Sequence, residues 1–289
     1  MVRDLRLQCV AIEPPLVLHQ DVDHVAQPHQ ELIRVIEFET FNPQLELVLA
    51  TGDSMAGRRA ADLYPSLATA YPELVFAEFD PDDAVGLDLA ILGLPHEASM
   101  QLAPQLVGQV GCLVDLSAAF RIKDADVYPA FYGFEHDEPD LLAEAVFGLP
   151  ELHREELRGA RLVATPGCHV TAATLALQPL VAAGLVEATG IVVNNVTGIT
   201  GAGRTPTETN VFTNIDSNVT AYGLLHHRHT PEMEQEIGAQ VTFTPHLVPM
   251  SRGILATCYA RPAGDCSPDR AMAVLREAYH GEPFTTVID

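Results

Sequence analysis

Basic residues are scarce in this sequence: 16 lysines and arginines stand against 39 aspartates and glutamates, for a formal net charge of -23. A surface that acidic repels phosphate backbones, so we expect no nucleic-acid partner. It also disfavours binding to anionic membrane surfaces. A small anionic substrate stays compatible with this charge, because a few arginines in a site act at short range despite the overall field.

Long apolar runs are also absent. No stretch approaches the roughly 20 residues needed to cross a bilayer, and the N-terminus lacks the basic region and apolar core of a signal peptide. Hydrophobic residues make up 47% of the 289 positions and charged residues 19%, which is typical of a folded globular protein. We therefore expect a folded, cytoplasmic protein without a membrane segment.

Cysteines are few and irregularly placed. There are five, Cys9, Cys112, Cys168, Cys258 and Cys266, and no two stand at CxxC spacing. The odd number and the spacing disfavour a disulfide scaffold and a zinc ribbon. One reactive thiol among buried ones is the natural alternative.

The first half alternates short apolar runs with helical segments, which predicts an α/β fold with a parallel sheet. Ligands usually bind such sheets at the carboxyl ends of their strands. The expected strands are 45–50, 87–94, 112–116 and 161–164, and the expected helices are 30–37, 56–62, 98–107 and 140–145.

The pattern changes after Gly167, and we expect a domain boundary there. Residues 169–183 read as one helix, kinked near Pro179 and stopped at Gly184. The expected strands of this half are 190–196, 241–249 and 253–260, and a further helix is expected at 268–280.

Cys168 follows a strand at the turn Thr165-Pro166-Gly167, so it lies in the first turn of the next helix. Unpaired N–H groups there favour an anion, which predicts a lowered thiol pKa and a nucleophile. Gly167 leaves room for a substrate carbonyl. A buried structural cysteine is the alternative, and it is the commoner fate of any one cysteine.

Several motifs, in order, resemble the N-acetyl-gamma-glutamyl-phosphate reductase family. ATPGCHVTAATLALQPL is similar to the family's active-site segment, where asparagine-proline-glycine-cysteine-tyrosine is usual. The other similar segments are VDLSAAFRIKDADVYPAFYG, FGLPEL, GITGAGRTP, HRHTPEMEQEI and FTPHLVPMSRGILATCYA. The resemblance runs from about Gln30 to Asp289.

The resemblance implies NADPH-dependent reductive dephosphorylation of N-acetyl-gamma-glutamyl phosphate, through a thioester on Cys168, in arginine biosynthesis. It implies a Rossmann-like parallel-sheet domain over residues 1–167 and an α+β catalytic and oligomerisation domain of the semialdehyde-dehydrogenase type over 168–289. It also implies a homo-oligomer. A sibling reductase acting on another acyl phosphate, as in a lysine route, remains an alternative.

By resemblance, His227 and His229 fall on a histidine pair of the family, and one should be the catalytic base, since histidine titrates near neutral pH. Glu232 could orient one of the two imidazoles. The alternative to a catalytic role is a structural one, in which Thr230 caps a helix and Pro231 is its first residue. A zinc site is disfavoured, because no further ligands accompany the histidines.

Arginine suits the phosphate and the carboxylate of the substrate, because its planar guanidinium can donate two hydrogen bonds to either group. The resemblance assigns substrate binding to Arg121, Ser251 and Arg252, and to Tyr222. Ala119 stands where the family usually has aspartate.

Cofactor contacts are implied at seven positions: Thr51, Arg58, Pro95, Ser117, Gly167, Gly198 and Gly201. Asp53 near the adenosine ribose would suit NAD, whereas Arg58 and Arg59 would accommodate the 2'-phosphate of NADP. NADP is the expectation, with NAD as the alternative.

Two departures from the family are expected at the ends. Residues 1–43 contain no glycine, so the GxxGxxG phosphate turn is not visible, although 9–12 could be a strand. The family continues beyond the strand expected at 284–288, with more sheet and a helix. A non-catalytic remnant that binds no dinucleotide is therefore the rival from another class.

Overall fold

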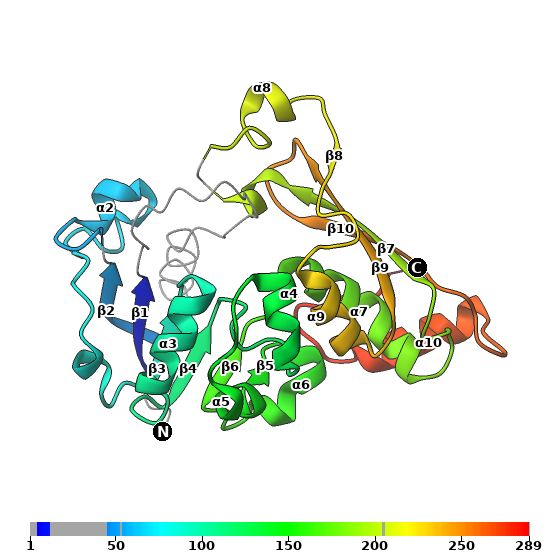
Figure 1. The fold of residues 1–289 in the computed structure, drawn as a ribbon, viewed down its shortest axis with the longest axis horizontal. Helices are drawn as coiled ribbons and strands as arrows, with labels where there is room; N and C mark the ends of the chain where they lie inside the picture. Colours follow the sequence, from blue (N-terminus) through cyan, green and yellow to red (C-terminus); the bar gives the residue numbers. More distant parts are fainter. Residues whose placement is uncertain (1–4, 12–44, 53, 204–205, 289) are drawn as a thin grey trace.

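The computed structural model describes residues 5–11, 45–52, 54–203 and 206–288 (Figure 1). Within these residues, the structure contains no helix with the length and apolar character of a membrane span. The strands form two sheets, and helices pack against both.

The first sheet has six parallel strands in the order β2-β1-β3-β4-β6-β5. The strands are β1 Leu5–Ala11, β2 Leu45–Gly52, β3 Leu89–Leu92, β4 Cys112–Asp115, β5 Val146–Phe147 and β6 Leu162–Ala164. This confirms the α/β prediction. Because β1 pairs with β2 on one side and β3 on the other, the strand order reverses at β1, and such reversals mark ligand crevices in α/β sheets.

Short helices fill the connections of the first half. They are α2 Ala60–Leu63, α3 His96–Leu106, α4 Tyr128–Tyr132, α5 Pro139–Glu144 and α6 Pro150–Leu157, with 3-10 turns η1 Pro65–Leu67, η2 Pro81–Ala84 and η3 Ala125–Val127. The helix expected at 56–62 is reduced to α2, because Gly57 has φ +79° in a turn that a helix cannot include. The helix expected at 30–37 lies outside the described residues.

The second sheet has four strands in the order β10-β7-β9-β8. The second half of the chain contains these strands and the helices around them: α7 Cys168–Ala182, β7 Ile191–Gly198, η4 Ile199–Ala202, α8 Phe212–Ile215, β8 Thr220–Ala221, α9 His229–Ile237, β9 Val241–Val248, β10 Ile254–Tyr259 and α10 Pro268–Ala278. The expected strands at 190–196, 241–249 and 253–260 are confirmed.

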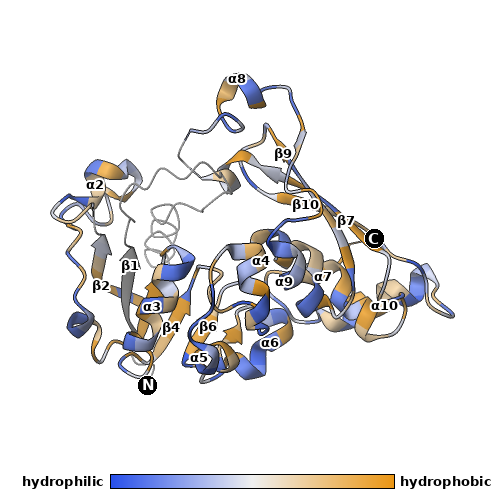
Figure 2. Cartoon of the chain, in the orientation of Figure 1, coloured by the Kyte–Doolittle hydropathy of each residue, from blue (hydrophilic) through white to orange (hydrophobic). Residues whose placement is uncertain are grey.

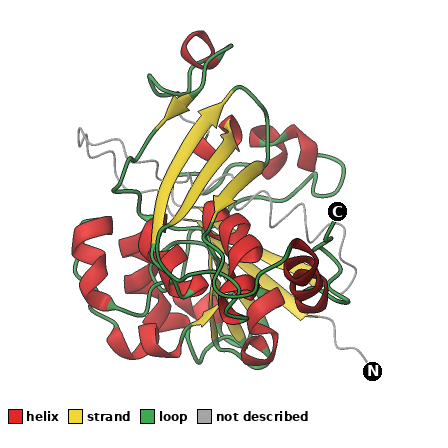
Figure 3. Ribbon diagram, turned by 90° about the vertical axis from the view of Figure 1, so that its right-hand side faces the viewer, coloured by secondary structure: helices red, strands yellow, loops and turns green. Residues whose placement is uncertain are grey.

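One face of the second sheet is covered by helices. Val170 and Leu177 of α7 and Met233 of α9 pack on Val193 of β7 and Phe243 of β9 in a single apolar core. Figure 2 shows orange, apolar stretches along the strands of this sheet, and Figure 3 shows helices gathered below it. This packing fixes the start of α7 against the start of α9.

The last residues differ from expectation. Residues 284–288 form no strand, and Phe284 is 93% exposed, so neither a neighbouring strand nor a core holds them extended. The thermodynamic reason is that an extended segment gains stability only from ladder hydrogen bonds and burial.

Candidate active site

Cys168 is the first residue of α7, directly after the turn that leaves the parallel strand β6. Cys168 as a whole residue is exposed to solvent, yet protein surrounds its thiol closely enough that desolvation raises the thiol pKa, while the nearby Arg121 lowers it. The prediction of a lowered pKa was therefore wrong in its net direction. Desolvation outweighs the charge of Arg121 and the backbone hydrogen bonds at this helix start.

Gly167, the N-cap of α7, has an ordinary extended backbone at φ -63° and ψ 143°. A β-carbon built on it would lie 2.6 Å from Nε2 of His229. The imidazole therefore packs directly on the turn that carries Cys168. Glycine is required here for close approach of a side chain, and this approach brings one histidine of the expected pair to the thiol's turn.

Glu232 anchors the same turn. Gly167 N–H donates to Oε1 of Glu232 at 2.8 Å, and Nη1 of Arg121 lies 3.7 Å from Oε2. Glu232 is fully buried; its burial raises the pKa of the carboxyl, whereas Arg121 and the Gly167 N–H oppose that shift. The prediction that Glu232 orients an imidazole was wrong, because its carboxylate faces a backbone amide and a guanidinium.

Arg121 is 9% exposed, and its Nη2 donates to the carbonyl of Leu116 at 2.8 Å. Gln235 of α9 holds the carbonyl of Arg121 at 3.0 Å and accepts from the N–H of Lys123 at 2.8 Å. These bonds tie the segment after β4 to α9. Arg121 therefore helps to hold the segment after β4 in place beside the site.

His227 and His229 lie edge to face, with ring centroids 4.8 Å apart. The N–H of His229 donates to Nδ1 of His227 at 3.1 Å. Burial, followed by the charges of His227 and Arg228, holds the pKa of His229 well below its usual range, so the ring is neutral at physiological pH. The alternative cap at Thr230 is wrong, because α9 already begins at His229 with Arg228 as its N-cap.

Two residues that sequence reasoning did not single out complete this cluster. Nε2 of His169 lies 2.9 Å from the hydroxyl of Tyr222, and Nδ1 of His169 lies 3.1 Å from the amide nitrogen of Asn195. Tyr222 was expected at the site, but His169 and Asn195 were read only as parts of a helix and a strand. Buried polar residues at inward positions of α7 and β7 were the signal that could have found them.

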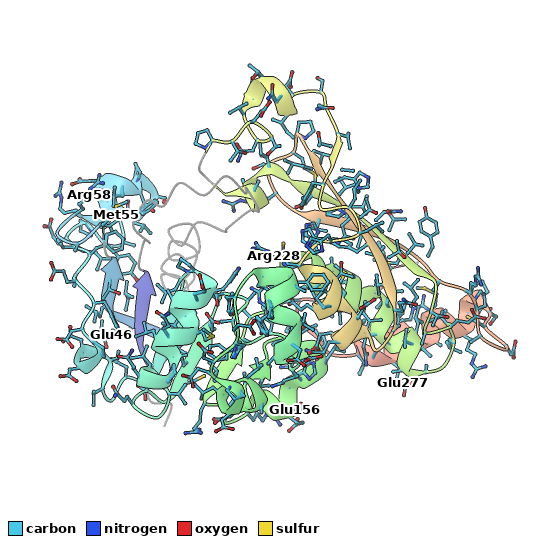
Figure 4. The ribbon with its side chains drawn as sticks, viewed as in Figure 1. Glu46, Met55, Arg58, Glu156, Arg228 and Glu277 are labelled. Atoms are coloured by element: carbon cyan, nitrogen blue, oxygen red, sulfur yellow. The ribbon has the colours of Figure 1, made fainter. Side chains whose placement is uncertain are left out.

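Arg228 and His96 connect the two halves of the chain. Nη1 of Arg228 lies 3.2 Å from Nε2 of His96, whose Nδ1 accepts from the N–H of Ala118 at 3.0 Å. Tyr132 of α4 donates its hydroxyl to the carbonyl of Arg228 at 3.2 Å. Figure 4 shows Arg228 beside α4 and α9, where these elements meet. Sequence reasoning missed both residues, because the resemblance assigned roles to their chain neighbours Pro95, His227 and His229 and none to His96 or Arg228.

Ser251 and Arg252 lie in the exposed turn between β9 and β10. Thr200 donates to the carbonyl of Ser251 through its N–H at 3.3 Å and through its hydroxyl at 2.6 Å. A β-carbon on Gly198 would meet the N of Arg252 at 2.9 Å, so this glycine permits the turn and the loop after β7 to touch. Gly201 is exposed in η4 beside that contact.

The other expected cofactor residues lie along the carboxyl edge of the first sheet. Thr51 is fully buried at the end of β2, and Ser117 is 5% exposed, with its hydroxyl donating to the buried Asp115 at 2.7 Å. Pro95 precedes α3 as its N-cap without a side-chain cap bond. Arg58 is exposed and contacts Sδ of Met55 at 3.5 Å (Figure 4).

In the part of the chain that the structure describes, histidine, cysteine and acidic side chains form no group of three suited to a metal ion. The histidines of the cluster instead contact one another, Tyr222 and Phe243 through their ring edges.

Comparison with known proteins places this arrangement in a family. Residues 29–160 match the semialdehyde dehydrogenase NAD binding domain, and residues 168–289 match the semialdehyde dehydrogenase dimerisation domain. The N-acetyl-gamma-glutamyl-phosphate reductase of Symbiobacterium thermophilum is 42% identical over 264 residues, covering 89% of this chain and 75% of that protein. That of Syntrophobacter fumaroxidans is 43% identical over 261 residues, covering 88% and 74%.

The chain belongs to the N-acetyl-gamma-glutamyl-phosphate reductase family. Members of this family are oxidoreductases, which confirms the enzyme class expected from the motifs. Another member, from Magnetococcus marinus, is 39% identical over 265 residues and covers 89% of this chain and 75% of its own length.

Solved structures of aspartate semialdehyde dehydrogenases share the reductase fold. The Candida albicans enzyme with NADP has a TM-score of 0.65 at 14% identity and covers 94% of this chain and 76% of its own. The Vibrio cholerae enzyme complexed with ASA has a TM-score of 0.61 at 14% identity, covering 99% and 84%. At such identity the likeness establishes the architecture of the two sheets.

Proposed function

We propose that this chain reduces N-acetyl-gamma-glutamyl phosphate to N-acetylglutamate 5-semialdehyde with NADPH, as a cytoplasmic enzyme of arginine biosynthesis. The observation that carries the proposal is the exposed Cys168 at the start of α7, with the His229 imidazole packed on Gly167 beside it. The relatives that carry this reductase name support the substrate.

Cys168 acts as the nucleophile in this proposal. Its sulfur attacks the acyl carbon of the acyl phosphate, the acyl–oxygen bond breaks, and phosphate leaves as a thioester forms. Because burial raises the pKa of the thiol, it must lose its proton to a neighbouring base before or during attack.

His229 is the base that the contacts favour. Its Nε2 points to Gly167, next to Cys168, and burial keeps the ring unprotonated, so a ring nitrogen is open to a proton, while the same burial makes this imidazole a weaker base than a free histidine. His227 accepts the backbone N–H of His229 through Nδ1 and thereby helps to hold the start of α9. Glu232 serves the same site by fixing the N–H of Gly167 rather than by touching substrate.

Substrate anions would bind at the exposed Arg252 and Ser251, while Tyr222 would contact the acyl group near Cys168. Arg121 was expected among these contacts. Its guanidinium is already engaged by Leu116 and Glu232, so we propose that it positions Glu232 and moderates the thiol pKa through its charge.

NADPH fits the carboxyl edge of the first sheet on one structural ground: the N-terminus of α3 begins at this edge with no side-chain cap at Pro95, and helix N-termini bind phosphate groups. Thr51, Pro95, Ser117 and Gly167 lie along the edge, Gly198 and Gly201 follow β7, and Arg58 would face a 2'-phosphate. When bound, NADPH supplies the hydride that reduces the thioester. NAD remains the alternative coenzyme.

One face of the second sheet has no helix packed on it among the described residues, and this uncovered face is the proposed contact between copies of the chain. Leu255 is 63% exposed and Tyr259 60% exposed on β10, and the register places them on the same face as Val196 and Val192 of β7. The match to a dimerisation domain over this half supports a homo-oligomer. We likewise propose residue 167 as the domain boundary, with domains 1–167 and 168–289.

The decisive experiment combines a fluorescence titration with NADPH and a turnover assay on the acyl phosphate. We expect micromolar binding, turnover that Cys168→Ser abolishes, and unchanged NADPH binding in that variant. Cys266→Ser, a cysteine in the loop before α10, is the matched control and should keep activity. No binding at millimolar NADPH would leave the non-catalytic remnant instead. Turnover only with other acyl phosphates would favour the sibling reductase.

A further inference from the structure

The side chain of Gln235, on α9, binds two backbone groups of a segment far away in the sequence. Its Oε1 accepts a hydrogen bond from the N–H of Lys123 at 2.8 Å, and its Nε2 donates to the carbonyl of Arg121 at 3.0 Å. The two backbone groups flank Ile122, which is 2% exposed. An amide side chain presents a carbonyl acceptor and an NH2 donor side by side, so Gln235 holds this stretch as a residue of a neighbouring parallel strand would.

These contacts fix the orientation of the Gln235 amide. A backbone N–H only donates and a carbonyl only accepts, so exchanging Oε1 and Nε2 would lose both hydrogen bonds. The second hydrogen of Nε2 is donated to Oε1 of Glu236 at 2.8 Å, and Oε2 of Glu236 lies 2.8 Å from Nε2 of His153 on α6. Both hydrogens of the amide and its oxygen therefore have partners, and fully satisfied polar networks of this kind are rigid.

The same face of α9 also binds the side chain of Arg121. Glu232 is three residues before Gln235, so both project from one face of the helix. Oε2 of Glu232 lies 3.7 Å from Nη1 of Arg121, whose carbonyl Gln235 holds. Oε1 of Glu232 accepts the N–H of Gly167 at 2.8 Å, and Gly167 is the N-cap of the helix that begins with Cys168. A continuous series of contacts thus runs from Gln235 to the turn of the proposed nucleophile.

This series of contacts crosses between the two halves of the chain. The segment that carries Arg121 follows β4 of the first sheet, whereas α9 packs with α7 on the second sheet, and Figure 1 shows α9 beside both α4 and α7. A shift of that segment would withdraw the guanidinium from Glu232, which is fully buried. A buried carboxylate without its cation is a disfavoured anion, so it reorients or takes up a proton. Either change weakens its hold on the N–H of Gly167.

We propose that Gln235 is a positioning residue for the reaction of Cys168: by fixing the segment after β4, it keeps Arg121 against Glu232 and so holds the turn that carries Cys168 in its reactive position. This inference rests on the proposed function of Cys168 as the nucleophile and deepens it. Among the described residues, none of the hydrogen bonds of Gln235 is made to that turn, so its effect must pass through the Arg121–Glu232 pair.

The first test measures hydrogen exchange of the Gly167 N–H in the full chain, by mass spectrometry with fragmentation to single amides. Gln235→Met keeps the length of the side chain and removes both of its bonds to the backbone. It should speed exchange at Gly167 about tenfold, the size of effect typical of residues coupled in one network of hydrogen bonds and ion pairs. Glu234→Met is the matched control, because Glu234 lies on the same helix and accepts the N–H of Val241 at 2.9 Å. The control should leave exchange at Gly167 unchanged.

A double variant tests the route of the effect. Glu232→Gln keeps an acceptor for the N–H of Gly167 but loses the charge that attracts Arg121. Adding Gln235→Met to this variant should speed exchange at Gly167 no further, because the connecting pair is already broken. An additive increase would overturn the proposal, as would exchange in Gln235→Met that is no faster than in the Glu234→Met control. An equal increase over the core amides of β7 and β9 would show general destabilisation and would overturn it as well.

Turnover provides the second measurement. Gln235→Met should lower kcat for the acyl phosphate about tenfold and change KM less than about threefold, because a misplaced nucleophile slows the chemical step. The proposed substrate-anion contacts, Ser251 and Arg252, lie in a different turn and stay in place. A raised KM with unchanged kcat would contradict a positioning role. Exchange needs neither NADPH nor acyl phosphate, so the expected exchange results in a protein without turnover would refute the proposed function alone.

Discussion

At the scale of single residues, Gly167 joins Cys168, the proposed nucleophile, to the His229 imidazole. Its backbone angles are open to every residue, so conformational freedom is not the reason for glycine. The reason is the His229 ring, which occupies the place where a β-carbon would go. The same residue gives its N–H to Glu232. One small residue thereby sets the positions of the Cys168 thiol, the His229 imidazole and the buried Glu232 carboxylate relative to one another.

Gly167→Ala should displace the His229 ring and lose most of the proposed turnover while the protein still folds. Overpacking of this kind costs about 1–3 kcal/mol of stability. Urea denaturation and steady-state rates measure the two effects. Gly201→Ala is the stability control, because among the described residues a β-carbon there would meet Thr197 alone, at an ordinary 3.4 Å. Unchanged turnover in Gly167→Ala would contradict the close approach of His229.

Glu232→Leu should destabilise the fold by about 3–5 kcal/mol, because it leaves the buried Arg121 guanidinium without its carboxylate and Gly167 without an acceptor. The double change Arg121→Leu with Glu232→Leu should restore part of that loss, since no charge then stays buried alone. Urea midpoints of the three proteins provide the measurement. A double variant less stable than Glu232→Leu would argue against the pairing.

At the scale of elements, the segment between β4 and α4 depends on long-range side-chain bonds more than on its own structure. Lys123, the only lysine of the sequence, donates from Nζ to the carbonyls of Leu142, Ala143 and Ala145 at the end of α5. Since α5 has no basic residue in its last turn, Lys123 supplies the positive charge that helix C-termini favour. The segment that carries Arg121 is held to α5 in this way.

Lys123→Met should therefore lower the free energy of unfolding by about 1–2 kcal/mol, a typical loss for hydrogen bonds made by a charged group near the surface. Thermal or urea denaturation would measure it. Lys123→Arg keeps the charge and should retain part of the stability. Equal loss in both variants would show that the geometry of Nζ, rather than charge at the end of α5, is what matters.

At the scale of the whole molecule, buried histidines link stability to pH. His96, His169 and His229 all have pKa values below the usual range because of burial. Between the folded and unfolded pKa values the unfolded chain binds more protons, so stability is lost as pH falls through this window. Asp115 and Glu232 have raised pKa values and act with the opposite sign, because their share of the stability is lost as pH rises above their unfolded pKa values.

His169 gives the most specific pH prediction, because its pKa falls from 6.5 to about 4 on folding. Its share of the stability lost between pH 7 and pH 5 should be about 2 kcal/mol. His169→Phe should show a shallower fall in its urea midpoint over this range than the unchanged protein. His153→Phe, which alters an exterior histidine paired with Glu236, is the comparison. Equal slopes in all three would contradict a neutral buried His169.

The proposed homo-oligomer can be tested at the face of the second sheet that carries Leu255 and Tyr259. Leu255→Glu places a charge on that face, next to Val196 across the β10–β7 pair. Sedimentation should then show a shift toward single chains, because a buried charge disfavours the contact. Glu187→Gln, outside the strands of this sheet, should keep the oligomer. An unchanged sedimentation profile in Leu255→Glu would place the contact elsewhere.

The sequence by itself determined the alternation of strands and helices, the cysteine at a strand-to-helix turn and the family. These follow from periodicity, turn residues and ordered motifs, which are local properties. It gave the wrong partner for Glu232 and the wrong direction for the pKa of Cys168.

Only the tertiary structure decided those points, because the contacts that make the site join distant positions. Gly167 and Glu232 are 65 residues apart, and His169 and Tyr222 are 53 apart. Packing of α7 and α9 on one face of the second sheet brings them together. The degree of burial that results, which no local pattern reports, sets the protonation of each histidine and of the thiol.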